Sequence, residues 1–185
     1  MTALITPSDL ERWSSLGACA EGLEWSAEPD RTRDEVVETY PEWLLEHDAE
    51  WLTAAEFARC IELAPWGALQ YARDRLTPEQ FARAVELAPW AALACAQDRL
   101  SPEQFARAVE LAPWAALRFA QPRLSLEQFT RCVELEPETA LKFALDRLTP
   151  EQFARAVERA PRIALEYAQE RLTPEQLTKA EEATR

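Results

Sequence analysis

The sequence repeats itself every 24 residues. The segment 76–99, LTPEQFARAVELAPWAALACAQDR, recurs at 100–123, where FARAVELAPWAAL is unchanged, and more distantly at 124–147 and 148–171. Moving back by the same interval gives the segment 52–75. A fixed short period is typical of proteins built from stacked structural units, so this feature constrains the fold more than any other.

Each unit predicts two short helices. Thr77 and Gln80 match a helix-opening capping box, and an apolar stripe follows at helical spacing. The stripe consists of Phe81, Ala84, Val85 and Ala88. Pro89 then begins a second helix that buries Leu93, and Leu100 closes the unit. We expect about ten residues in each helix, too few for stability in isolation, so stacking on neighbouring units must stabilise them.

The two ends of the chain are divergent versions of this unit. Residues 1–27 predict a helix capped by Thr6 and ended near Gly17, followed by a second short helix. Residues 28–51 follow the 24-residue register again, with Pro41 aligned to Pro65. The tail 172–185 keeps one helix with a polar outer face, as expected of a terminal cap.

The sequence therefore predicts an all-α solenoid of stacked two-helix 24-residue repeats. We divide it into an acidic N-terminal cap of divergent repeats (1–51), five regular repeats (52–171) and a polar C-terminal capping helix (172–185), all within one continuous domain.

Negative charge is concentrated at the N-terminus. The chain carries a net charge of −13, and residues 1–50 hold thirteen acids against three arginines, a net −10. The other 135 residues carry a net −3. We interpret the chain as an acidic head followed by a nearly neutral series of repeats.

Three tryptophans form the first candidate partner-binding site. Trp66, Trp90 and Trp114 occupy the same repeat position, which becomes Glu138 and Arg162 in the next two units. A position that accepts Glu and Arg is expected to be at least half exposed. The row could anchor a protein partner, or each indole could pack flat over the next unit.

Four acids of the head form the second candidate site: Glu42, Glu46, Asp48 and Glu50. Clustered carboxylates can complement a basic patch or imitate a phosphate backbone. The head could therefore inhibit a nucleic-acid-handling protein by occupying its basic site. The alternative is a solubilising cap, which a stacked repeat array requires in any case.

Two further sets of residues are predicted to be structural. One is the position that is apolar in every unit: Tyr71, Cys95, Phe119, Phe143 and Tyr167. We expect these side chains to lie in the core and to form the contact between repeats. The other set is the cysteines, Cys19, Cys60, Cys95 and Cys132, which show no CxxC pairing and are predicted to be reduced core thiols.

Two arginine ladders follow the repeats, one on the first helices and one at the unit ends. Their members are Arg59, Arg83, Arg107, Arg131 and Arg155, and Arg75, Arg99, Arg123, Arg147 and Arg171. Acids such as Glu86 and Glu79 lie three residues after or four before the first ladder, which predicts pairing within each helix. Nucleic-acid binding needs uncompensated basic charge, so we predict none.

Catalytic and cofactor signatures are missing from the sequence. His47 is the only histidine, and no Ser/His/Asp set, glycine-rich phosphate loop or metal-ligand spacing occurs. We predict no enzymatic activity, no cofactor and no metal. The first residues lack a signal peptide and no apolar run reaches membrane-spanning length, so we expect a cytoplasmic protein that does not contact membranes.

The period of 24, the leucine at each unit end and the two short helices resemble the leucine-rich repeat variant family over residues 28–172. This resemblance implies a right-handed superhelix, mostly without an assigned activity. The chain lacks that family's cysteine-ligated cluster domain, so no cofactor is implied. The segment 17–25, GACAEGLEW, is similar to a short stretch of uncharacterised bacterial and phage proteins, which indicates a bacterial or mobile-element origin. The sequence as a whole predicts a protein-binding scaffold or, alternatively, an acidic inhibitor.

Overall fold

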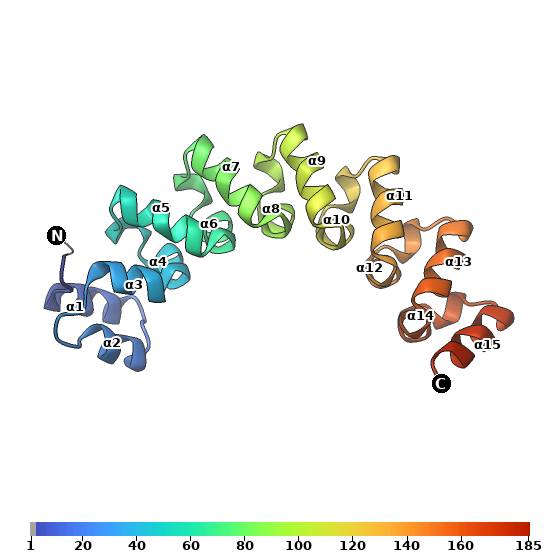
Figure 1. The fold of residues 1–185 in the computed structure, drawn as a ribbon, viewed down its shortest axis with the longest axis horizontal. Coiled ribbons are helices and arrows are strands. Elements are labelled where there is room, and N and C mark those ends of the chain that lie inside the picture. The colour runs from blue at the N-terminus through green and yellow to red at the C-terminus, as the bar shows by residue number, and fades with distance from the viewer. Residues whose placement is uncertain (1–2) are drawn as a thin grey trace. The chain divides into compact units, whose positions relative to one another are not determined.

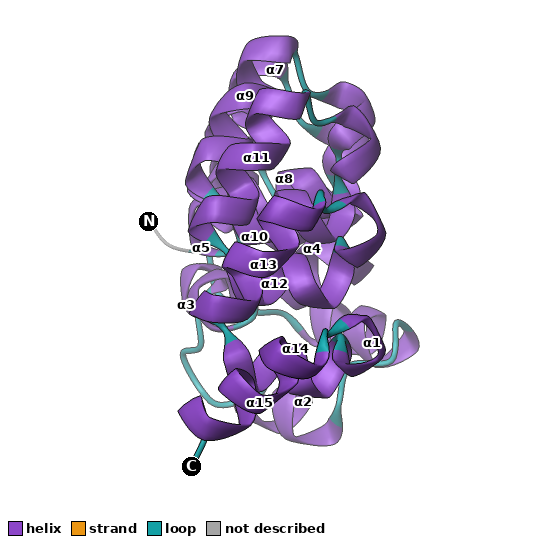
Figure 2. Cartoon of the chain, turned by 90° about the vertical axis from the view of Figure 1, so that its right-hand side faces the viewer, coloured by secondary structure: helices purple, strands orange, loops and turns teal. Residues whose placement is uncertain are grey.

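The computed structural model describes residues 3–185, and this part of the chain is built from helices (Figure 2). The described residues contain fifteen α-helices, joined by turns and short 3-10 helices, and no strand beyond an isolated bridge between Leu4 and Thr32. The predicted all-α class is therefore confirmed.

The chain divides into two compact units. Unit 1 comprises Met1–Ala88. Its α-helices are α1 (Pro7–Ser15), α2 (Ala20–Ser26), α3 (Arg33–Thr39), α4 (Pro41–His47), α5 (Ala54–Leu63), α6 (Pro65–Tyr71) and α7 (Pro78–Leu87) (Figure 1). Within it, α3 packs on α5, α4 on α6, and α5 on α7.

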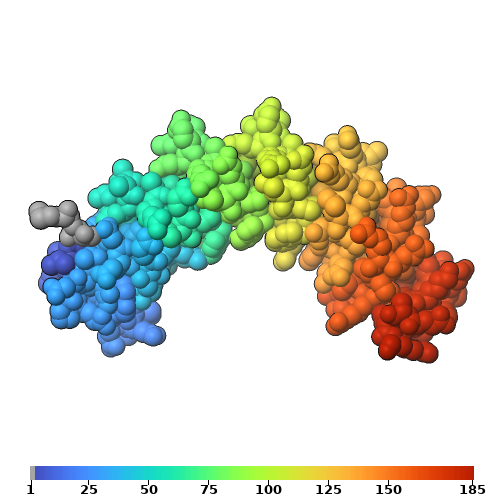
Figure 3. Space-filling view, in the orientation of Figure 1, coloured from blue at the N-terminus to red at the C-terminus, as the bar shows by residue number. Residues whose placement is uncertain are grey.

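Unit 2 comprises Pro89–Arg185. Its α-helices are α8 (Pro89–Cys95), α9 (Pro102–Leu111), α10 (Pro113–Phe119), α11 (Leu126–Leu135), α12 (Pro137–Phe143), α13 (Pro150–Arg159), α14 (Pro161–Tyr167) and α15 (Pro174–Ala183). The seven-residue helices lie side by side in chain order, with α8 on α10, α10 on α12, and α12 on α14. In the space-filling view this unit, coloured green-yellow to red, appears as successive packed layers (Figure 3).

Capping explains where the ten-residue helices begin. In α7 the Thr77 side chain accepts a hydrogen bond from the Gln80 backbone N–H, and the Gln80 side chain accepts one from the Thr77 N–H. The same reciprocal pair opens α5, α9, α11, α13 and α15. Thr32 and Glu35 form it at α3, as the sequence predicts.

The second helix of each unit is shorter than expected, with seven residues rather than about ten. At Ala96 the backbone leaves the helical region, with φ −133° and ψ 21°, and a 3-10 helix over Gln97–Arg99 follows. This extra turn leads to Leu100, which is buried. The 24 residues thus divide into ten, seven and a three-residue 3-10 turn, with linkers between them.

The core consists of the predicted apolar stripe. Phe81, Ala84 and Val85 on α7 are buried, as are Leu93 on α8 and Ala96 directly after α8. The N-terminal helices are also as predicted, with a Thr6 capping box opening α1 and Gly17 at a φ of +83° just beyond its end. A side chain at Gly17 would be strained by that backbone conformation.

Candidate protein-binding surface

The tryptophans of unit 2 lie at an exposed edge and also pack on each other. Trp90 is 40% exposed and Trp114 is 38% exposed. Their rings stack with centroids 6.4 Å apart and planes 26° apart. In unit 2 each of these indoles therefore packs against its neighbour and still presents a large surface to solvent, whereas partner binding by the row stays a prediction.

The aromatic residues at the position predicted to lie in the core and to connect the repeats are half-exposed. Phe119, Phe143 and Tyr167 are 38%, 44% and 47% exposed, and Tyr71 in unit 1 is 38% exposed. Each ends a seven-residue helix. The core assignment of these positions was wrong, because the short helix buries its alanines and leucine and leaves the last side chain over the surface.

Ring and cation contacts connect Trp90, Trp114, Phe119 and Phe143, and Lys142, the residue before Phe143, extends the row to Tyr167. The Trp114 ring meets Phe119 edge-on at 6.5 Å, and the Arg118 guanidinium lies 5.0 Å from both the Phe119 and Phe143 ring centroids. Lys142 Nζ lies 5.1 Å from the Tyr167 ring. We call the five rings, which lie on α8, α10, α12 and α14, the aromatic strip: Trp90, Trp114, Phe119, Phe143 and Tyr167.

In unit 1 the third tryptophan lies beside two of the predicted acids. Trp66, Glu42 and Glu46 line one open cleft of about 430 Å³ between α4 and α6. The Trp66 ring meets Tyr71 at 5.9 Å. Burial, and then the neighbouring carboxylates of Glu46 and Glu42, raise the pKa of Tyr71. The structure thus brings together residues that the sequence assigned to two separate sites.

Asp48 does not belong to the exposed acidic surface. Its side chain is fully buried, and its carboxylate accepts hydrogen bonds from Arg12 Nε at 2.7 Å, Arg12 Nη2 at 2.5 Å and Trp13 Nε1 at 3.1 Å. An acid held in this way joins α1 to the end of α4 and is unavailable to a partner. Glu50, two residues later, is exposed.

Two more arginines of the head are held between an indole and a carboxylate. Arg33 lies 3.4 Å from the Trp51 ring centroid while its Nε and Nη2 donate to Glu56 at 2.7 and 2.8 Å. These hydrogen bonds, opposed in part by burial, lower the pKa of Glu56 to about 2. Arg31 similarly lies 3.8 Å from the Trp25 ring and pairs with Glu35.

Two arginines of the first ladder lie closer to an acid on the preceding first helix than to acids on their own helix. Arg83 donates to Glu62 of the preceding ten-residue helix through Nε and Nη2, both at 2.8 Å, whereas its approach to Glu86 on its own helix is 3.6 Å. Arg59 pairs in the same way with Glu38 at 2.7 Å. Arg107 keeps the predicted pairing within one helix, with Glu110 at 3.2 Å.

The unit-end arginines link neighbouring layers of unit 2. Arg123 and Arg147 each donate to a backbone carbonyl 26 residues earlier, those of Gln97 and Gln121. Each guanidinium also lies 4.3 Å from a phenylalanine ring of the preceding ten-residue helix. In return, the Gln97 side chain donates to the Phe119 carbonyl at 2.8 Å. These arginines are therefore structural links between layers.

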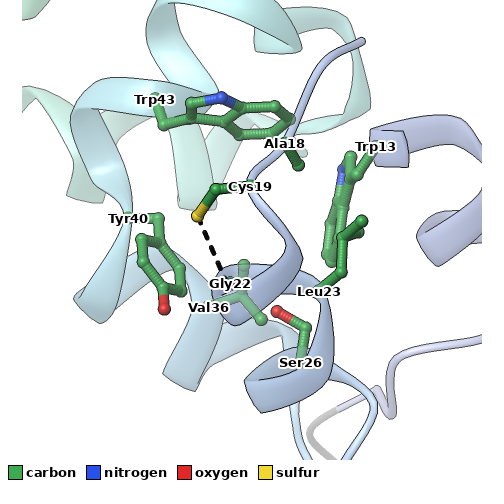
Figure 4. A pocket seen from close by; sticks show the side chains of 9 residues that line it. All are labelled: Trp13, Ala18, Cys19, Gly22, Leu23, Ser26, Val36, Tyr40 and Trp43. Atoms are coloured by element: carbon green, nitrogen blue, oxygen red, sulfur yellow. Dashed lines mark hydrogen bonds between the residues drawn. The ribbon is translucent and has the colours of Figure 1, made fainter. Parts of the chain in front are cut away.

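A small apolar cavity of about 80 Å³ lies between α2 and α4 in unit 1 (Figure 4). The rings of Trp13, Tyr40 and Trp43 surround it, and Cys19 Sγ accepts a hydrogen bond from the Gly22 N–H at 3.4 Å. A Cβ at position 22 would meet Cys19 Sγ at 3.3 Å, so a residue larger than glycine there would require the thiol to shift by a few tenths of an ångström. Part of the segment 17–25 thus serves to pack α2 beneath the aromatic rings.

The four cysteines are free thiols in different surroundings. Cys60 and Cys132 are buried as predicted, and burial raises their pKa values to about 12 and about 11. Cys19 is exposed and Cys95 is half-buried, so the prediction of a core thiol was wrong for these two.

Across residues 3–185, no group of three or more His, Cys, Asp or Glu side chains gathers in a way that could hold a metal ion. Nor does any helix of that region have the length and apolar character needed to cross a bilayer. Comparison of the chain with protein-family models, with curated proteins and with solved structures found no match.

Proposed function

We propose that this chain is a non-enzymatic protein-binding module, built as a right-handed solenoid of two-helix repeats, and that unit 2 binds its partner through the aromatic strip. The observation that carries the proposal is the connected set of exposed rings on α8, α10, α12 and α14. Contiguous exposed aromatic surface marks interaction sites, and aromatic residues are enriched among the side chains that dominate binding energy.

The ten-residue helices support the solenoid arrangement. They begin at positions 54, 78, 102, 126, 150 and 174, each with the same reciprocal cap. Helices of this kind bury their apolar faces only by stacking, and arrays of such units generally provide extended binding surfaces.

The test is quantitative affinity capture from a bacterial lysate with the wild-type chain, the double variant Trp90→Ala/Trp114→Ala and the control Leu126→Ala. Leu126 is 76% exposed but lies on α11, outside the strip. We expect a defined set of proteins to be lost with the tryptophan variant and kept with the leucine variant. Circular dichroism must show that all three chains remain helical. An identical set of captured proteins for all three would contradict the proposal.

A second candidate is an acidic inhibitor whose head occupies a basic site. The net −10 of residues 1–50 favours it, as do the three exposed or half-exposed acids Glu42, Glu46 and Glu50. Binding through the head should weaken steeply between 50 and 500 mM salt, whereas binding through the strip should change little. Reversal of the three acids to lysine should abolish capture only in the inhibitor case.

A further inference from the structure

The cavity between α2 and α4 is closed at one end and open at the other. Its floor contains Trp13, Ser26 and Val36, all of which are buried. At its mouth lie Cys19, which is exposed, and Trp43, which is half-buried. A concave space that is mostly apolar and holds a few polar groups is typical of sites for small molecules.

A buried hydroxyl group faces this cavity. Ser26 is only 4% exposed, and its hydroxyl forms no hydrogen bond with any residue of 3–185. Every side-chain nitrogen or oxygen of that range that is closed to solvent has a partner, so the Ser26 oxygen borders space that a water-sized molecule can enter. Figure 4 shows this oxygen pointing inward between Val36 and Leu23, into the cavity. A buried hydroxyl without a partner costs free energy, which favours a ligand that supplies one.

Other polar atoms around the cavity are engaged or directed elsewhere. Trp13 Nε1 donates to Asp48 at 3.1 Å, and Cys19 Sγ accepts from the Gly22 N–H at 3.4 Å. The ring nitrogen of Trp43 lies on the edge of the indole farther from Gly22 (Figure 4). The floor of the cavity therefore offers a ligand the Ser26 hydroxyl, surrounded by rings and aliphatic side chains.

Two rings of the cavity replace small core residues of the regular repeats. Tyr40 and Trp43 occupy the repeat positions of Ala88 and Ala91. Both alanines are buried, whereas Tyr40 and Trp43 are half-buried and line the cavity. The aromatic lining is thus a feature of the divergent head, where the regular repeats have alanine in the core.

We propose that the α2–α4 cavity binds a phenol, a small molecule with a single aromatic ring and one hydroxyl group. The ligand hydroxyl forms a hydrogen bond with Ser26, and the ligand ring lies among the cavity rings, which favour aromatic neighbours in edge-on or offset contact. The volume of about 80 Å³ is roughly half of the ~150 Å³ of an apolar cavity that encloses benzene. The ligand is therefore no larger than one ring, and its far edge lies at the mouth beside Cys19. This binding is independent of the aromatic strip and of the acidic surface.

The test follows the fluorine NMR signal of 4-fluorophenol during titration with the full chain, and compares it with fluorobenzene, which lacks the hydroxyl. We expect saturable binding of 4-fluorophenol with a Kd of about 1 mM or lower. Ser26→Ala should weaken 4-fluorophenol binding about fivefold and leave fluorobenzene binding unchanged. Ser14→Ala, an exposed serine on α1, should change neither. No saturable binding to the wild type would mean that water alone satisfies Ser26 and would overturn the proposal, as would equal weakening of both compounds by Ser26→Ala.

A second pair of variants tests the location. Ala18→Leu places a larger side chain in the cavity and should weaken binding of both compounds at least tenfold, whereas Ala55→Leu on the exposed face of α5 should have no effect. Circular dichroism checks that both variants remain helical. Equal effects of the two substitutions would place binding elsewhere and overturn the assignment.

A competition experiment tests the preference for an aromatic ring. Cyclohexanol keeps the hydroxyl but has no aromatic ring, so it should displace 4-fluorophenol only at several-fold higher concentration than phenol does. Equal displacement by the two compounds would overturn the assignment of a phenol as the ligand.

Discussion

Burial separates acidic residues that look alike in the sequence. Asp48 and Glu50 are two positions apart, yet Asp48 is enclosed by Arg12 and Trp13 while Glu50 faces solvent. A buried carboxylate that binds two donors is stabilising only while both donors are present. Some of the acids in the head therefore have a structural role and do not belong to an exposed acidic surface.

The variant Asp48→Asn should destabilise unit 1. The amide keeps the shape of the side chain but loses the charge that pairs with Arg12, so we expect a decrease of about 1–3 kcal/mol in the free energy of unfolding. Urea unfolding followed by tryptophan fluorescence measures it, with Glu50→Gln as the control. Equal stabilities of the two variants would argue against a structural role for Asp48.

Glu56 should make the stability of the chain sensitive to acid. Its pKa falls from an ordinary 4.5 to about 2, because Arg33 hydrogen-bonds the charged form in the folded state. A depressed carboxyl pKa contributes stability that is complete above pH 4.5 and is lost as the pH falls towards 2. Urea midpoints at pH 7, 4 and 2.5 should therefore fall less for Glu56→Gln than for the wild type. Glu79→Gln, on the exposed face of α7, should behave as the wild type.

The sequence indicated which positions are apolar but not which of them are covered. The repeat positions of Leu93 and Phe119 are both apolar in every regular repeat. Leu93 is nevertheless fully buried, whereas Phe119 is 38% exposed. The difference depends on where a seven-residue helix ends, which a repeated pattern alone does not specify. Asp48 was misplaced for a related reason, because its partner Arg12 lies 36 residues away in a divergent repeat.

At the scale of helices, caps and prolines made the boundaries predictable. The starts of α1, α3 and α7 follow directly from Thr6, Thr32 and Thr77. The 3-10 turn after each second helix was not predicted, because its residues, such as Gln97–Arg99, match no capping or turn signature. Its function became visible only with the arginine and glutamine links that it supports.

The link that Arg147 makes from the 3-10 turn after α12 can be tested by mutation. Arg147→Ala removes the hydrogen bond to the Gln121 carbonyl and the contact with the Phe129 ring, so we expect a loss of about 1 kcal/mol in stability. Arg131→Ala, an exposed arginine on α11 itself, is the matched control and should be nearly neutral. Thermal unfolding of both variants gives the comparison. A neutral Arg147→Ala would mean that the guanidinium contributes no net stability.

At the scale of the molecule, the net charge differs between the two units, and the helices of unit 2 differ in how many other helices pack on them. Unit 1 carries eighteen acids and seven arginines, a net −11, whereas unit 2 carries a net −2. Within unit 2, α10 packs on α8, α9, α11 and α12, whereas α15 packs chiefly on α13 and α14. Local stability in a folded protein is expected to rise with the number of helices that pack on an element.

Hydrogen exchange followed by mass spectrometry should reveal that gradient. Amides in α10 should exchange at least tenfold more slowly than amides in α15, because opening α10 exposes surface on both sides. Helix α10 has seven residues and no side-chain cap, whereas α15 has ten residues and a complete capping box, so slower exchange in α10 would reflect its packing and not its length or cap. Equal exchange in both helices would indicate that unit 2 opens only as a whole.

The Asp48 clamp also has a consequence for the order of events during synthesis. Its partners Arg12 and Trp13 lie 36 and 35 residues before Asp48 in the sequence, and the hydrogen bond from Trp51 to Asp9 spans 42 residues. The arginine hydrogen bonds of unit 2 span at most 26 residues. Helix α1 is made before η1 (Ala49–Trp51) and cannot complete these contacts until that later segment has left the ribosome. Until then the indole of Trp13 lacks its contacts with Trp43, Asp48 and Trp51, so a helix made before these residues completes its packing after them.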